Sequence, residues 1–157
     1  MPSITSITVE EMEVGQKASY SKTCSWEDVQ LFAKVSGDVN PVHLDEDFAA
    51  GTQFKQRIAH GMYTSALVSA GVAIVFPGPG SIYLGQDISF KAPVFIDDTI
   101  DVELEVESIR KDKSIVSLLF TCQNQHGVTV ASGKATIMAP REKVTIEAPT
   151  LPAISIG

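Results

Sequence analysis

Asp38 and His43 are the two residues of this sequence best suited to acid–base chemistry. A carboxylate and an imidazole can together move protons near neutral pH, because the imidazole changes charge in that range. The two residues are five positions apart, with Asn40 and Pro41 between them. An extended chain would place their Cα atoms as much as ~16 Å apart, so the chain must bend to join them. Spacing alone is compatible with two interpretations. The two residues form an acid–base pair, or Asp38 caps a turn and His43 is a structural residue.

A second candidate site lies at His60 and Gly61, which precede the most apolar stretch of the chain. A glycine at the start of a helix leaves backbone N–H groups open to a ligand oxygen, as in an oxyanion hole. A simple backbone requirement for glycine explains the residue equally well. Ser65, one helical turn further on, is a candidate to line the same pocket, although packing among small residues also accounts for it.

The spacing patterns of several other kinds of site are missing from the sequence. The three histidines form no i, i+4 pair and no cluster with carboxylates, so we predict no metal site. There is no GxxxxGK[ST] or GxGxxG phosphate loop and no Gly-x-Ser-x-Gly elbow. Cys24 and Cys122 have no CxxC or histidine companion, which predicts two reduced, partly buried thiols.

The charge and hydropathy of the chain argue against nucleic acid and membrane as partners. The net charge is −7, and the 12 lysines and arginines form no run. The most apolar stretch, 61–76, has 16 residues, fewer than the ~20 that a membrane-spanning helix needs. No secretory signal pattern is visible at the N-terminus. We therefore expect a cytoplasmic protein.

The elements that must position these residues follow from capping signals and periodicity. Ser25 can cap a helix at 25–36, and Gly37 suits its left-handed end. An ordered non-helical segment is expected at 38–43, and a short helix at 45–50. After the apolar helix that begins at Gly61, the period changes from helical to two. Strands are expected there and before the first helix, at 17–22, 82–90, 100–107, 114–123 and 128–138.

This order predicts an α+β fold in which an antiparallel β-sheet wraps around one long central helix. The apolar helix is the central one, because it carries no charge on any face and must be buried. Periodicity is lost at Pro140. We therefore expect one domain at 1–139, followed by a tail or linker at 140–157.

Three separated motifs resemble the MaoC-like dehydratases, the hot-dog-fold family of the (R)-specific enoyl-CoA hydratases. They are FAKVSGDVNPVH at 32–43, IAHGM at 58–62 and GSIYLGQ at 80–86, in the family's order. The resemblance covers about residues 14–139. The segment after Pro140 looks like the linker in chains where such a domain is fused to a phosphate acyltransferase.

The resemblance implies a hot-dog fold and the reversible hydration of trans-2-enoyl-CoA to (R)-3-hydroxyacyl-CoA. In the family, the residues matching Asp38 and His43 hold and activate the catalytic water, and the N–H matching Gly61 stabilises the thioester oxygen. The residue matching Asn40 supports the loop, and we place Ser65 with the substrate-binding residues.

Partners and cofactors follow from the same resemblance. It implies an acyl-CoA substrate, no cofactor beyond the CoA that the substrate carries, and a homodimer or higher homo-oligomer paired edge to edge. An acyl-carrier-protein substrate would favour a basic docking patch, which this acidic chain does not show. The alternatives are an acyl-CoA thioesterase on the same fold, or a non-catalytic module that binds acyl thioesters.

Overall fold

The computed structural model describes residues 2–157. In chain order its elements are β1 (Ser3–Thr5), the 3-10 helix η1 (Val9–Glu11), β2 (Lys17–Thr23), α1 (Trp26–Ser36), α2 (Pro41–Leu44), α3 (Glu46–Ala50), α4 (Gly61–Ile74), β3 (Ile82–Phe90), β4 (Thr99–Arg110), β5 (Ile115–Gln123), β6 (Thr129–Met138) and β7 (Thr145–Glu147). The strands expected after the apolar helix are therefore present, with shifts of a few residues at their ends.

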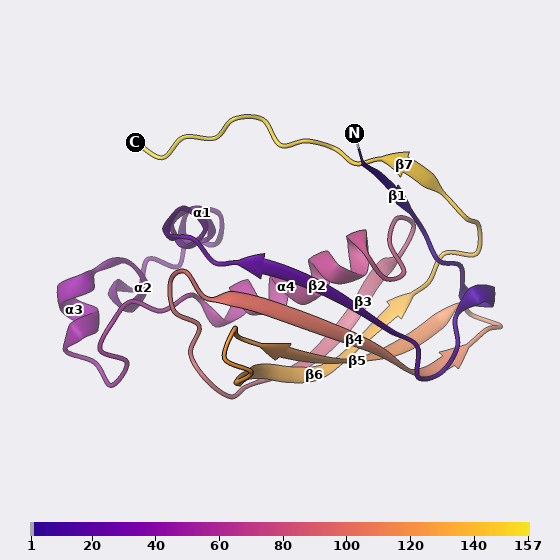
Figure 1. Ribbon diagram of the computed structural model, residues 1–157, viewed down its shortest axis with the longest axis horizontal. Helices are drawn as coiled ribbons and strands as arrows, with labels where there is room; N and C mark the ends of the chain where they lie inside the picture. The colour runs from indigo at the N-terminus through magenta and orange to yellow at the C-terminus, as the bar shows by residue number, and fades with distance from the viewer. Residues whose placement is uncertain (1) are drawn as a thin grey trace.

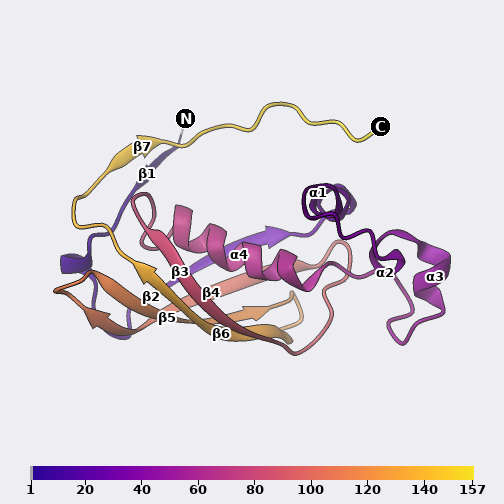
Figure 2. The ribbon, with the colours of Figure 1, turned by 180° about the vertical axis from the view of Figure 1, so that it is seen from behind.

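Five strands form one antiparallel sheet in the order β2-β4-β5-β6-β3. Helix α4 lies along the concave face of this sheet, as both views show (Figure 1, Figure 2). The close approach of helix and sheet depends on Gly71, where an added Cβ would lie 3.3 Å from the Cβ of Tyr20. The predicted α+β layers, with a sheet around one central helix, are confirmed.

Strand β4 shows why the chain folds in this way. Its residues alternate between buried aliphatic side chains and partly exposed acidic ones. This alternation gives the strand one face for the core and one for solvent. The buried face meets the apolar residues of α4 in one core. Those contributed by β4 are Ile100, Val102, Leu104 and Val106.

Helix α1 begins and ends at the residues that the sequence indicated. The hydroxyl of Ser25 accepts a hydrogen bond from the N–H of Asp28, and the Asp28 carboxylate accepts from the N–H of Ser25. This reciprocal pair satisfies backbone groups that the first turn leaves free. At the other end Gly37 has φ 81°, a left-handed conformation that glycine adopts without strain.

The prediction of a non-helical segment at 38–43 was wrong in part, because residues 41–43 belong to α2. Pro41 occupies the first position of this helix, where its fixed φ is favourable and its missing N–H costs nothing. The side chain of Asn40 caps the helix by accepting a hydrogen bond from the N–H of Val42. The following helix was predicted correctly at 45–50, with Asp45 as its cap.

A second, two-stranded sheet joins the two ends of the chain. Strand β1 pairs antiparallel with β7, within the segment that was expected to be a tail or linker. Three-residue strands carry too few positions to show a period, so the sequence did not predict them. From Pro149 the chain continues without helix or strand, exposed and extended (Figure 1).

Both cysteines are free, and they are buried more completely than the sequence predicted. Burial raises the pKa of Cys24 to about 11 and that of Cys122 to about 12. Since the thiolate is the reactive form, neither residue is suited to nucleophilic chemistry. Among the described residues, no helix is long and apolar enough to cross a membrane.

Candidate active site

Asp38 is held in a tight turn directly after α1. Gly37 turns the chain away from the helix, and the N–H of Asp38 then donates to the hydroxyl of Ser36. One carboxylate oxygen of Asp38 accepts a hydrogen bond from the N–H of Asn40. The side chain remains half-exposed, at 51%. The carboxylate is therefore fixed in place and still open to a small molecule.

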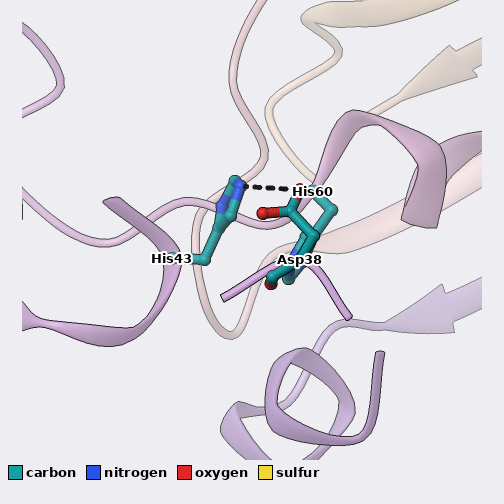
Figure 3. Close-up of side chains that lie close together, drawn as sticks. All are labelled: Asp38, His43 and His60. Atoms are coloured by element: carbon teal, nitrogen blue, oxygen red, sulfur yellow. Dashed lines mark hydrogen bonds and ion pairs between the residues drawn. The ribbon is translucent and has the colours of Figure 1, made fainter. Parts of the chain in front are cut away.

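His43 faces Asp38 from α2. Its Nδ1 lies 2.7 Å from the carbonyl oxygen of Ile58. Since a carbonyl can only accept, Nδ1 carries the proton and Nε2 keeps its lone pair when the ring is neutral. Nε2 lies 3.9 Å from Oδ2 of Asp38, too long for a direct hydrogen bond (Figure 3). One water oxygen can lie within hydrogen-bond distance of both atoms.

The surroundings of His43 keep it neutral near physiological pH. Burial lowers the pKa of His43, because it removes water from around the charged ring. The hydrogen bond to the Ile58 carbonyl opposes this shift, His60 adds to it, and Asp38 opposes it. The net direction is downward, so the free lone pair at Nε2 is available as a proton acceptor.

His60 completes the cluster and was not predicted to take part in it. The residue is buried, with 3% of its surface exposed. Its Nε2 donates a hydrogen bond to the backbone oxygen of Asp38 at 2.9 Å, and its ring stacks on that of His43 at 3.8 Å between centroids. The sequence feature that pointed to His60 was its position directly before the candidate oxyanion residue, Gly61.

The cluster bears on the predicted absence of a metal site. Asp38, His43 and His60 each offer a ligand atom, and these atoms lie within 4.8 Å of one another, which the sequence spacing did not indicate. The two imidazole planes are stacked at an angle of 25°. A zinc ion 2.0–2.1 Å from both ring nitrogens would lie outside both planes, which is poor coordination geometry. The absence of a metal site stays a prediction.

Gly61 is the first residue of α4, at its positive end. It does not have the positive φ that other glycines of this chain adopt, so a special backbone conformation does not explain it. An added Cβ would lie 3.2 Å from the ring of Phe90. The missing side chain therefore lets the Phe90 ring pack closely against the start of α4, and both residues border a pocket.

A pocket of about 400 Å³ opens at this point. Its lining is mostly apolar and includes a single charged side chain, that of Lys91. An apolar cleft with a few polar groups is typical of a small-molecule site. Asp38 and His43 are not among its lining residues, but His60 is, and so is Ile58, whose carbonyl oxygen binds His43.

The two remaining predicted site residues lie in supporting positions. Asn40 caps α2 and so supports the loop between Asp38 and His43. The hydroxyl of Ser65 accepts a hydrogen bond from the side chain of Gln86 in β3. Ser65 does not border the pocket, whereas its neighbour Thr64 does. The structure thus joins Asp38, His43 and, through His60, Gly61, but it gives Ser65 a partner elsewhere.

The sheet around a central helix, with an aspartate and a histidine beside the start of that helix, defines a hot-dog-fold protein with a candidate acid–base site. Residues 8–126 match the family model of the MaoC like domain. The chain belongs to the MaoC-like family, which confirms the resemblance seen in the sequence.

Several relatives share most of their length with this chain. It is 44% identical over 131 residues to the (R)-specific enoyl-CoA hydratase of Rhodospirillum rubrum, covering 83% of this chain and 90% of the relative. It is 43% identical over 134 residues to the enzyme of that name from Aeromonas caviae, covering 85% and 100%. The unliganded R-hydratase PhaJ1 from Pseudomonas aeruginosa superposes with a TM-score of 0.95 at 52% identity, over 99% of this chain and all of that one.

Proposed function

We propose that this chain is an (R)-specific enoyl-CoA hydratase, a hydro-lyase that reversibly converts trans-2-enoyl-CoA to (R)-3-hydroxyacyl-CoA. The observation that carries the proposal is the 3.9 Å approach of Asp38 Oδ2 and His43 Nε2, two groups able to hold one water (Figure 3). The (R)-specific enoyl-CoA hydratases that are 43–44% identical to this chain support the choice of reaction.

In the proposed mechanism, Asp38 and His43 orient and activate the water. Nε2 of His43 accepts a proton as the water oxygen forms its bond to C3 of the enoyl group. The double-bond electrons move toward the thioester carbonyl, and a proton carried by the pair is delivered to C2. The hydrogen and hydroxyl of one water are thereby added across C2 and C3.

The thioester oxygen gains negative charge during this step and needs a donor. The N–H of Gly61 points out of the first turn of α4, where backbone N–H groups have no partner within the helix. A donor that already faces the developing charge stabilises the transition state without reorganising. We therefore assign the oxyanion role to Gly61.

The pocket supports an acyl-CoA as the substrate. Its apolar lining suits an acyl chain, and Lys91 places a cation at its border on a chain of net charge −7. Ser65 stays a predicted substrate-binding residue, although its bond to Gln86 favours a role in joining α4 to β3. Asn40 acts through the cap that shapes the loop.

A homodimer is also part of the proposal. Strand β3 lies at one edge of the main sheet, with its pairing groups on that side free for a second copy. Apolar side chains are exposed along it, namely Ile82, Leu84 and Phe90. Light scattering on the purified protein tests this, with twice the chain mass of 16.8 kDa expected.

Two further expectations remain proposals. The last strand of the main sheet ends at Met138, which supports a domain at 1–139, while 140–157 contributes β7 and the extended end. The cytoplasmic location stays a prediction that cell fractionation would test.

The proposed reaction is tested with crotonyl-CoA. Enoyl absorbance and free thiol are followed together, and the product is resolved on a chiral column. Loss of absorbance without thiol release, with (R)-3-hydroxybutyryl-CoA as product, is the expected result. Release of free CoA would indicate the thioesterase alternative instead, because hydrolysis breaks the thioester and hydration does not. If neither signal changed with crotonyl-CoA or with longer enoyl-CoA substrates, the non-catalytic binding module would be favoured.

A further inference from the structure

His60 contacts each proposed part of the site. It lies next to Gly61 in the chain, binds the backbone of Asp38, and stacks on His43. It approaches Asp38 across 22 positions of sequence. The side chain is almost completely buried, although the residue borders the pocket.

The hydrogen bond to Asp38 shows which nitrogen of the His60 ring carries a proton. Its acceptor is a carbonyl oxygen, which can only accept, so Nε2 of His60 carries the proton. This bond restrains the backbone of Asp38 at the residue whose carboxylate faces His43.

The stacking of His60 on His43 restrains the imidazole ring of His43. The two rings lie 3.8 Å apart between centroids, with an interplanar angle of 25°. Phe32 of α1 also contacts His60, with 5.1 Å between the ring centroids, and Phe32 meets Tyr63 edge to face. A continuous set of aromatic contacts therefore runs from the start of α4 and from α1 to the imidazole of His43.

Ordinary structural roles do not account for this residue. His60 occupies the N-cap position of α4, yet its side chain makes no capping hydrogen bond. Nδ1 is buried and has no hydrogen-bond partner among residues 2–157. A buried polar atom without a partner is unfavourable, so a residue selected only for packing would not need this nitrogen.

We infer that His60 is a positioning residue that holds Asp38 and His43 in their catalytic geometry. This inference rests on the proposed function and adds to it a residue that acts through the other two. Asp38 and His60 are the titratable side chains that act on the pKa of His43, Asp38 by raising it and His60 by lowering it.

Two variants separate the two contacts. His60→Phe keeps an aromatic ring for the stack but removes the donor to the Asp38 carbonyl. His60→Gln keeps an amide donor but removes the ring. The matched control is His126→Gln, which changes an exposed histidine in the turn between β5 and β6. Circular dichroism and thermal melting establish which variants fold.

The first readout is the separation of kcat from KM with crotonyl-CoA. Both His60 variants should lower kcat about tenfold or more, since small displacements of reacting groups cost that much, with KM within about twofold. The second readout is the NMR titration of His43 in the free protein. With three histidines in the chain, single variants assign each imidazole signal. In His60→Phe the pKa of His43 should rise, because the neighbour that lowers it is gone.

The outcomes are distinct. Folded His60 variants with reduced kcat and an altered His43 titration support the inference. Folded variants with wild-type kcat and an unchanged titration would overturn it, as would equal effects from His126→Gln. If the wild-type chain fails to hydrate any enoyl-CoA, the proposed function fails, and the titration of His43 still decides whether His60 controls it.

Discussion

Nε2 of His43 lies 3.9 Å from Oδ2 of Asp38, although an extended chain would hold the two residues far apart. The two residues approach each other because a turn is followed directly by a short helix. Gly37 reverses the chain after α1, and Asn40 starts α2 at once by capping it. His43 then lies on the side of this short helix that faces Asp38 (Figure 3). Together the turn and α2 bring the two groups within reach of one water.

Replacing either member of the pair should reduce hydration strongly. Asp38→Asn and His43→Gln each remove one proton-transfer group while keeping a side chain of similar size. We expect kcat with crotonyl-CoA to fall by about 10²–10⁴-fold, the usual contribution of a positioned acid or base. Thermal melting should stay close to that of the wild type for Asp38→Asn, whose side chain is half-exposed. Wild-type turnover in either variant would contradict the assignment.

The pH dependence of hydration should reflect the lowered pKa of His43. His43 accepts a proton only when it is neutral, so activity is lost as pH falls through its pKa. Since burial lowers that pKa, the acid limb of kcat/KM should lie below the value of about 6.5 that is usual for histidine. A profile of kcat/KM for crotonyl-CoA between pH 4.5 and 8 measures this. A limb at or above 6.5 would show that another group controls the reaction.

The free energy of unfolding should also depend on the protonation of His43, and it should decrease as the pH falls. The unfolded chain binds a proton at His43 more readily than the native one, because the native pKa is lowered. The contribution of His43 to stability is therefore complete above about pH 6.5 and is lost as pH falls toward the native pKa. Urea unfolding across this range should show a smaller pH slope in His43→Gln than in the wild type.

Gly61→Ala tests whether the glycine serves the pocket. The added Cβ would lie 3.2 Å from the ring of Phe90, so it would displace this ring, which borders the pocket. We expect kcat/KM to fall about tenfold or more with little change in melting temperature, since one methyl group in a pocket has effects of that size. Adding Phe90→Leu to Gly61→Ala relieves the contact and should restore part of the loss. A fully active Gly61→Ala would contradict this reading.

Gly133→Ala should destabilise the sheet without touching the site. Its Cβ would overlap the backbone oxygen of Asp87 in the neighbouring strand and lie 2.8 Å from the ring of Phe120. We expect a loss of about 1–3 kcal/mol or more in the free energy of unfolding, the range for overpacked positions. Gly85→Ala is the matched control in the same sheet, because its Cβ meets nothing within 4 Å. Urea unfolding of both variants measures the difference.

The local elements of the fold could be predicted because their signals lie within a few residues. Ser25 and Gly37 mark the two ends of α1, and the alternation along β4 assigns one face to the core. α2 was missed because four residues are too few for a helical period. β1 and β7 were missed for the same reason, and because their partners lie at opposite ends of the chain.

The sequence by itself determined which residues were candidates for chemistry: Asp38, His43 and Gly61 stand out by type, by neighbours and by motif. It also determined that a charge-free helix must be covered by a sheet. Only the tertiary structure decided that Asp38 and His43 face one another, that His60 joins them, and that Ser65 bonds to Gln86 instead of lining the pocket. The chemistry of a side chain and the periodicity of a helix or strand can be read from a short segment of sequence. The meeting of side chains from separate elements depends on how those elements pack, which no local pattern encodes.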